Sequence, residues 1–358
     1  MSDQQNKTYL NTAACGLLEP AVVAAASNFN NLLATEGSNR SEHWRREDEP
    51  RIRGVIAEFL GADARNIALV PNFSWAVNGI VQSLRGDERV TLYRRDYPSL
   101  TEPFKINDRN IQWLDDEDGF TLPVSQLHER IRNKETDLVV ISHVQYNSGY
   151  RLDIKETGAL CREHGVWLII DATQSMGAIP INMQELHADV VIASNYKWMN
   201  AGFGSGVMYL SDAFLSAYPP AVGGNNSYRE YDGVMQYRPS AQSYEPGHPN
   251  MSGLLLLEAA ITHKLQMGIA NIAEHNDKLT ALMLDKIKDL PLQLIGPATM
   301  AHRCSIILLK DVNGLSDWLR EHDIVVTNRG GMVRISVHYY NTEADVMRLV
   351  SCLSAMGR

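Results

Sequence analysis

Short apolar runs alternate with helix-like segments along this chain from about residue 60 onward. Ser74–Leu84 and Ile154–His164 are examples of the helix-like segments. Such alternation favours a mostly parallel sheet with helices on both faces, and strands that are apolar throughout are typical of burial on both faces. The pattern therefore predicts an α/β fold. The expected strands are Ile67–Val70, Arg89–Tyr93, Leu138–Ser142, Val166–Ile170, Val190–Ala193 and Gly206–Leu210.

The sequence changes in character beyond about residue 250. Ser252–Leu290 predicts one long helix, or two in succession with Gly268 at the break. A smaller α+β domain is expected after it, and the extended first 20 residues are expected to pack with that domain. We therefore expect a large domain over residues 18–260 and a small domain formed by residues 1–17 and 261–358. The elements expected in the small domain are strands at Ser305–Leu309, Ile324–Val326 and Met332–Val337, a helix at Leu315–His322 and a last helix from Thr342.

The composition of the 358 residues is that of an ordinary globular protein, with 44% apolar and 21% charged residues. A net charge of −9 gives no sign of a nucleic-acid partner. No apolar run approaches the roughly 20 residues of a membrane span, and the polar N-terminus lacks the apolar part of a signal peptide, so a cytoplasmic protein is expected. The cysteines are scattered without a CxxC pair, which indicates neither a zinc site nor a disulfide framework. They are Cys15, Cys161, Cys304 and Cys352.

Polar residues follow two of the apolar runs at the points where the strands end. Asp171 directly follows Val166–Ile170, and Lys197 lies shortly after Ala188–Ala193. At the mouth of a parallel sheet, neighbouring strand ends converge on one crevice. An acid and a lysine there suit pyridoxal phosphate (PLP), because its aldehyde forms a Schiff base with a lysine and its ring nitrogen needs a carboxylate. Gln174 would meet the phenolic oxygen beside the aldehyde.

The phosphate of this cofactor needs its own set of donors. Phe73 and Ser74 lie between the strand that ends at Val70 and the start of a helix. Free backbone N–H groups and the helix dipole favour an anion at such a helix start. Ser194 and Tyr196 would add two hydroxyl groups from the segment that carries the lysine.

Taken singly, each of these residues has a simpler interpretation. A lone lysine is usually a surface charge, Ser74 is compatible with an ordinary helix N-cap, and Asp171 with a strand-end cap or a metal ligand. A metal site formed by His143, Asp171 and His187 would lack two ligands at helical i, i+4 spacing, so no metal is expected.

Five further segments occur in order along the chain. They are Tyr9–Ala14 (YLNTAA), Asp96–Ser99 (DYPS), Ser142–Gly149 (SHVQYNSG), Glu245–Asn250 (EPGHPN) and Asn328–Ser336 (NRGGMVRIS). Together with the aspartate, glutamine and lysine, they resemble the class V aminotransferase family of fold-type I PLP enzymes. This family includes cysteine desulfurases, selenocysteine lyases and isopenicillin N epimerase-like proteins. The resemblance runs nearly end to end, and it implies a mostly parallel sheet of the seven-stranded type plus a small C-terminal α+β domain.

The resemblance also implies roles around the cofactor. Tyr97 would stack on the pyridine ring, and Gln145 would lie beside it. His248 stands where the family has a threonine that reaches the phosphate of the partner subunit. A homodimer with active sites at the subunit interface is therefore expected, and the Gly223–Gly224 loop is expected near the partner's site.

For the substrate, the resemblance assigns the α-carboxylate to Arg334, whose guanidinium matches it in a two-point fork. Arg329 and Asn11 are expected nearby. Arg45 and Arg229 are further candidates, for a second carboxylate.

The reaction is expected at the α-carbon of a small amino acid, with transamination through a Lys197 Schiff base as the first expectation. Desulfurases of the family carry a nucleophilic cysteine on a loop near these arginines, but only Gly330-Gly-Met-Val333 separates Arg329 from Arg334. A C–S or C–Se lyase and an epimerase stay open, because they share the first steps. An intact set of site residues argues against a non-catalytic binding module. Candidates for a second proton carrier are Tyr97, His43 and His248.

Overall fold

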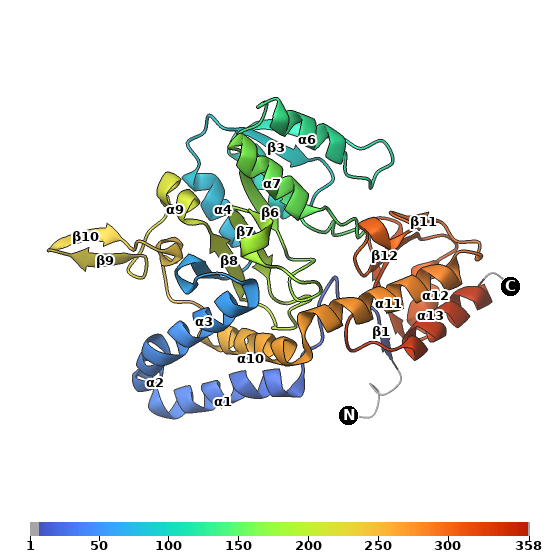
Figure 1. The fold of residues 1–358 in the computed structure, drawn as a ribbon. Helices are drawn as coiled ribbons and strands as arrows, with labels where there is room; N and C mark the ends of the chain where they lie inside the picture. The colour runs from blue at the N-terminus through green and yellow to red at the C-terminus, as the bar shows by residue number, and fades with distance from the viewer. Residues whose placement is uncertain (1–6, 357–358) are drawn as a thin grey trace.

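Seven strands form the central sheet of the computed structural model, which describes residues 7–356 (Figure 1). Their order across the sheet is β2-β8-β7-β6-β5-β3-β4. Neighbouring strands run parallel except at β8, which is antiparallel to β2 and β7. The predicted α/β class with a mostly parallel seven-stranded sheet is confirmed. The strands are β2 (Ile67–Val70), β3 (Arg89–Tyr93), β4 (Asn110–Leu114), β5 (Leu138–Ser142), β6 (Trp167–Asp171), β7 (Val190–Ser194) and β8 (Gly206–Leu210).

Both faces of this sheet are covered by helices, which explains why its strands are apolar throughout. Along β5, Val139 and Ile141 pack into one hydrophobic layer, whereas Leu138 and Val140 pack into the other. The first layer includes residues of α3 (Glu49–Leu60), α6 (Val124–Arg132), α7 (Ile154–His164) and α10 (Met251–Met267); the second includes residues of α4 (Phe73–Ser83), α5 (Pro98–Ile106) and α9 (Asp212–Ala217).

A four-stranded antiparallel sheet lies at the other end of the molecule, on the right in Figure 1, in the order β11-β12-β15-β14. Near the N-terminus, β1 (Thr8–Tyr9) pairs with β13 (Ile324–Val325) and so joins this end. α10 passes through residue 260 without a break, and the domain boundary there stays a prediction. The other elements of this end are β11 (Leu294–Ile295), β12 (Ile306–Lys310), β14 (Thr327–Asn328), β15 (Met332–Ser336), α11 (Ile269–Ile287), α12 (Leu315–Glu321) and α13 (Glu343–Met356).

Three helical segments and a hairpin add to what the sequence predicts. α1 (Pro20–Glu36), α2 (Ser38–His43) and a π-helical turn, η1 (Trp44–Asp48), lead into α3. The hairpin of β9 (Tyr228–Tyr231) and β10 (Val234–Tyr237) projects from the body on the left of Figure 1. The remaining short elements are η2 (Ala64–Asn66), α8 (Met183–Leu186), η3 (Ala241–Tyr244) and η4 (Met300–His302).

The connection between the two ends follows the sequence prediction. The segment expected as one long helix or two is two helices, α10 and α11, separated by Gly268 at φ +81°. In the described chain, no helix combines the length and the apolar character that crossing a bilayer requires.

Candidate active site

A cavity of about 430 Å³ opens at the carboxyl ends of β5, β6 and β7. Parallel strands of an open α/β sheet commonly form ligand sites at this edge. Eight of the residues predicted to form the site line this cavity, although they come from four separate segments. Its lining consists of Asn72, Phe73, Ser74, Tyr97, Ser142, Tyr146, Asp171, Thr173, Gln174, Ser194, Tyr196, Lys197, Phe203 and Gly204.

Lys197 lies on a tight turn just after β7. The turn is closed by Asn200, which adopts φ +57° and donates its backbone N–H to the Lys197 carbonyl at 3.1 Å. Gly16 packs against the same carbonyl so closely that a Cβ atom there would lie 2.0 Å from the oxygen. The backbone of Lys197 is therefore held from both sides.

The Lys197 side chain is 5% exposed and reaches into the cavity. Burial lowers the pKa of its amine; Asp171 opposes this shift, whereas Arg334 and Arg329 add to it. Within residues 7–356 the amine accepts and donates no hydrogen bond; the centroids of the Tyr97 and Tyr196 rings lie 5.6 and 5.5 Å from it. The amine is thus desolvated and free to react.

Asp171 ends β6 on the same side of the sheet. Its Oδ1 accepts the backbone N–H of Thr173 at 2.8 Å, and the residue is 5% exposed. Burial raises the pKa of this carboxyl, while Thr173 and Lys197 lower it. A buried carboxylate with open acceptor positions suits a protonated ring nitrogen.

Gln174 is fixed by its surroundings. Its Oε1 accepts the indole N–H of Trp198 at 2.7 Å, and its Nε2 donates to the carbonyl of Ala13 at 3.1 Å. One N–H of the amide is left for a ligand in the cavity.

The start of α4 faces the cavity, as expected for a phosphate site. Asn72 is the N-cap, because its Oδ1 accepts the backbone N–H of Trp75 at 2.8 Å. The alternative of Ser74 as the cap is therefore wrong, and the Ser74 hydroxyl stays available. Phe73 N–H donates to the hydroxyl of Ser194 at 2.9 Å, which joins the helix start to the end of β7.

Arg334 lies on β15 and does not line the cavity, but its charge lowers the pKa of the Lys197 amine. Its side chain is fully buried, and its Nη1 donates to the carbonyl of Tyr146 at 2.7 Å. The Nε and Nη2 atoms are buried without a partner, as is Nε of Arg329, whose guanidinium lies 5.5 Å from the centre of the Tyr146 ring. Unpartnered buried donors are costly, and a carboxylate would satisfy both atoms of Arg334.

A sequence profile of the Aminotransferase class-V family matches residues 8–349. The chain belongs to the class V aminotransferase family. Its members are PLP-dependent enzymes, so this chain is a PLP-dependent enzyme as well.

Known relatives cover the chain from end to end. It is 25% identical to an uncharacterized aminotransferase, YcbU, of Bacillus subtilis (strain 168), over 98% of this chain and 95% of that protein. The apo structure of a cysteine desulfurase from Thermococcus onnurineus NA1 matches with a TM-score of 0.89 at 21% identity, covering 98% of this chain and 94% of the other. The cystine C–S lyase C-DES, in complex with its product cysteine persulfide, matches with a TM-score of 0.86 at 19% identity and 98% coverage of both chains. The two structures show that the fold is shared.

Five residues predicted for the site of this family member do not line the Lys197 cavity: Gln145, Arg329, Arg334, Asn11 and His248. Gln145 donates through Nε2 to Asp96 at 3.2 Å and lines a neighbouring cavity, which Arg329 also lines. Asn11 accepts the hydroxyl of Thr327 at 2.5 Å. His248 lies in a separate, larger cavity.

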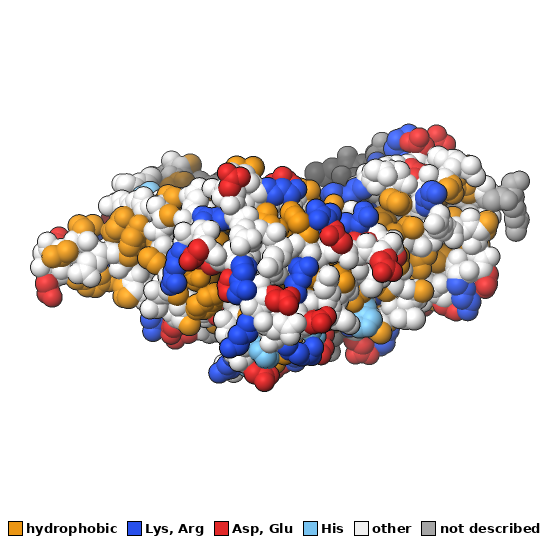
Figure 2. All heavy atoms as spheres, turned by 90° about the horizontal axis from the view of Figure 1, so that it is seen from above, with side chains coloured by type: hydrophobic (Ala, Val, Ile, Leu, Met, Phe, Trp, Pro, Cys, Tyr) orange, Lys and Arg blue, Asp and Glu red, His pale blue; other side chains and the backbone are white. Residues whose placement is uncertain are grey.

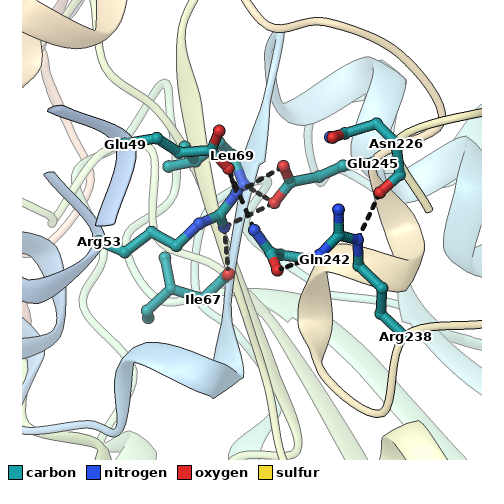
Figure 3. Close-up of polar contacts among 8 residues, drawn as sticks. All are labelled: Glu49, Arg53, Ile67, Leu69, Asn226, Arg238, Gln242 and Glu245. Carbon is teal, nitrogen blue, oxygen red and sulfur yellow. Dashed lines mark hydrogen bonds and ion pairs between the residues drawn. The ribbon is translucent and has the colours of Figure 1, made fainter. Parts of the chain in front are cut away.

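This larger cavity, of about 820 Å³, brings together His248, Arg45 and Arg229 from distant parts of the chain. A buried ion-pair cluster forms its floor. Figure 3 shows Arg53 between Glu49 and Glu245, with two contacts of 2.7 Å to the carboxylate of Glu245. We refer to it as the arginine-lined cavity.

The short turn between Arg329 and Arg334 contains no cysteine. Gly330 and Gly331 have positive φ angles of 57° and 79°, which produces a tight reversal between β14 and β15. Cys15 is partly buried but does not line the Lys197 cavity. No thiol of the described chain lines that cavity.

Several lining residues are absent from the set predicted from the sequence. Each lies within or next to a motif already recognised, so adjacency was the available signal. They are Asn72, Ser142, Tyr146, Thr173, Phe203 and Gly204.

Proposed function

We propose that this chain catalyses transamination at the α-carbon of a small amino acid, with Lys197 as the catalytic residue. The observation that supports this most is the buried Lys197 amine, which has no hydrogen-bond partner in the described chain and faces the cavity beside Asp171. When bound, PLP supplies an aldehyde that an amine can hold and a ring that accepts electrons from a bond broken at the α-carbon.

The cavity residues fit this cofactor. Asp171 would hold the ring nitrogen, the remaining N–H of Gln174 would meet the phenolic oxygen, and Tyr97 would cover one ring face. The start of α4, with the backbone N–H and the hydroxyl of Ser74, would bind the phosphate. Ser194, Tyr196 and Phe73 complete this cup as lining groups.

The proton-transfer role of Lys197 follows from its environment. Because its pKa is lowered, the uncharged amine is populated near neutral pH and Nζ can take a proton from the substrate α-carbon. Arg334 would fix the α-carboxylate through the two donors that have no partner, and so set which bond at the α-carbon meets Nζ.

Product analysis with the PLP-loaded enzyme tests the proposal. Each amino acid is incubated with the enzyme, and keto acid, ammonia, sulfide and stereochemical inversion are recorded. Transamination gives a keto acid and an equal amount of pyridoxamine phosphate when no acceptor is present. Ammonia or sulfide without pyridoxamine phosphate would contradict it.

A C–S lyase is the second candidate. A structural neighbour is described as a cystine C–S lyase, and elimination of this kind requires no cysteine nucleophile. Such a reaction is therefore compatible with a Lys197 cavity that no thiol of the described chain lines. With cystine as substrate, this candidate predicts cysteine persulfide as the leaving group, together with pyruvate and ammonia, and no pyridoxamine phosphate.

We further propose that the protein is a homodimer in which the arginine-lined cavity faces the partner's active site. His248, which the resemblance assigns to the partner's phosphate, lies there together with Arg45 and Arg229, the candidates for a second carboxylate. Hydrophobic side chains gather at the left end of Figure 2, where the hairpin projects; Val234 and Met235 are 56% and 60% exposed. Exposed apolar surface on a projecting element is typical of a protein contact.

A subunit-mixing experiment tests this arrangement. Lys197→Ala and His248→Ala each inactivate both sites of a homodimer. If His248 serves the partner's site, unfolding and refolding an equal mixture should restore about one quarter of wild-type activity, because half of the dimers are hybrids with one complete site. No recovery, or an active monomer in light scattering, would contradict the proposal.

A further inference from the structure

A second buried lysine, Lys264 of α10, lies beneath the turn that carries Lys197. It is 1% exposed, and within the described residues no carboxylate forms an ion pair with it. Its Nζ donates to Asn200 Oδ1 at 2.9 Å, lies 3.3 Å from His338 Nε2 and lies 4.4 Å from the centre of the Tyr339 ring. Burying an unpaired ammonium is costly, so packing alone does not account for a lysine here.

The neighbouring imidazole of His338 indicates which protonation state of Lys264 fits at this position. His338 Nε2 lies 2.9 Å from the carbonyl of Trp198, so this nitrogen bears the proton and donates it. Its Nδ1 accepts from Asn276 Nδ2 at 3.3 Å. With this proton in place Nε2 has no lone pair for Lys264, so within the described residues an ammonium would have one hydrogen-bond acceptor, Asn200 Oδ1, whereas an uncharged amine has one proton fewer to satisfy.

The surrounding charges agree with an uncharged amine. Burial lowers the pKa of Lys264 to about 7. The carboxylate of Glu19, which accepts the hydroxyl of Tyr339, opposes this shift. Burial and Lys264 hold the pKa of His338 well below its ordinary value. The titratable groups that face the pair are His263 on α10, His275 on α11, Glu19 before α1, and Tyr339 and Tyr340 after β15.

Lys264 supports the Lys197 turn through Asn200. Asn200 closes the turn through its backbone N–H, and its Nδ2 donates to the carbonyl of Leu17 at 2.9 Å. Its Oδ1 is the acceptor for Lys264 and lies 3.1 Å from His338 Nε2. The strained αL conformation of Asn200 is therefore anchored by its own side chain.

The same network reaches two other parts of the site. Trp198, whose carbonyl accepts from His338, donates its indole N–H to Gln174. His338 follows β15 by two residues, and β15 carries Arg334. One cluster thus supports the catalytic lysine, the glutamine and the carboxylate arginine.

We propose that Lys264 is a positioning residue for Lys197: by donating to Asn200 it fixes the turn that aims the catalytic amine at the substrate held by Arg334. This inference rests on the catalytic role proposed for Lys197. Lys264 does not touch the substrate, and it acts through the geometry of the turn.

The test compares Lys264→Met with Lys264→Gln in the PLP-loaded enzyme. The two side chains have the same length, and only glutamine has a polar hydrogen for Asn200. Both variants should take up PLP. We expect kcat to fall on the order of tenfold in Lys264→Met with KM nearly unchanged, and to stay within about threefold of wild type in Lys264→Gln.

A spectroscopic titration provides a readout that a purely structural role would not move. The pH midpoint of the visible absorbance of lysine-bound PLP should shift in Lys264→Met and stay at the wild-type position in Lys264→Gln. Lys278→Met, on the exposed face of α11, is the matched control and should change neither kcat nor the midpoint.

The outcomes separate this inference from the proposed function. Equal kcat values and equal midpoints in the two variants would overturn it, because the donor would then have no effect on the turn. Failure of both variants to take up PLP would also overturn it, because Lys264 would then be needed for the pocket itself. If the wild-type protein forms no lysine-bound PLP, the proposed role of Lys197 fails instead.

Discussion

Lys197 and Lys264 are both buried, and burial lowers the pKa of each amine, yet their surroundings differ. The amine of Lys197 faces a cavity and has no hydrogen-bond partner in the described chain. The amine of Lys264 is enclosed and donates a hydrogen bond to Asn200. A lowered pKa is therefore shared by a group that is available for covalent chemistry and one that holds its neighbours in place. The two lysines are distinguished by the cavity, which Lys197 lines and Lys264 does not.

Removing Lys197, the lysine that faces the cavity, is the most direct test of this comparison. Lys197→Ala should abolish the visible absorbance of lysine-bound PLP and lower the turnover rate by more than about 10³-fold, because both the attachment point and the proton carrier are lost. Absorbance spectra and steady-state rates provide the measurement. Lys264→Met is the control and should keep the band. A band that survives in Lys197→Ala would assign the covalent role to another residue.

The buried guanidinium of Arg53 shows what carboxylate partners change for a basic side chain. Arg53 is 5% exposed and lies between Glu49 and Glu245 (Figure 3). Glu245→Gln leaves part of its charge uncompensated, so the free energy of unfolding should fall by about 3–5 kcal/mol, measured by urea denaturation. The control Glu42→Gln removes a partner from the exposed ion pair with Arg46 and should change stability by less than about 1 kcal/mol. A small effect of Glu245→Gln would show that water reaches this cluster.

The sequence predicts Lys197 and misses Lys264 for a physical reason. Lys197 and Asp171 follow apolar strands, and the geometry of a parallel sheet brings such strand ends together. Lys264 lies within a helix, and no local pattern tells whether its side chain meets water or the underside of a distant turn. His338 and Asn200, which explain its burial, lie 74 and 64 residues away.

Other differences between prediction and structure have local causes. Asp232-Gly233, both at positive φ, is a strong signal for a type I′ turn. The hairpin is nevertheless not predicted, because β9 contains two charged residues and neither strand shows apolar alternation. β4 was missed because its partly buried edge position does not require a continuous apolar run. The role proposed for His248 requires a second subunit, which one sequence does not describe.

Removing Arg334, the proposed carboxylate-binding group, tests how the substrate is placed against Lys197. Arg334→Ala should raise KM for amino acids about 100-fold, because a bidentate charge-assisted contact is lost, while PLP uptake persists. Steady-state kinetics measure this. Arg320→Ala, an exposed arginine on α12, is the control and should leave KM unchanged. An unchanged KM in Arg334→Ala would move the carboxylate site, with Arg329 as the next residue to test.

The smallest expected effect is on the pH dependence of stability. It tests whether Lys264 is retained for positioning rather than for packing. Because the pKa of Lys264 is about 7 in the fold and near its ordinary value of 10.5 in the unfolded chain, the unfolded chain binds an extra proton between these values. The stability of the wild type therefore rises with pH in this window, by at most about 1.4 kcal/mol per pH unit from this group. Lys264→Met lacks this contribution.

The variant should thus be more stable than wild type by about 1–4 kcal/mol at pH 7, and this advantage should shrink toward pH 10. Urea denaturation of both cofactor-free proteins at pH 7, 8 and 9 measures the difference, and Lys197 contributes equally to both. Higher stability combined with a lower kcat is the result expected of a residue retained for positioning. A variant that is less stable at every pH would show that Lys264 is retained for packing.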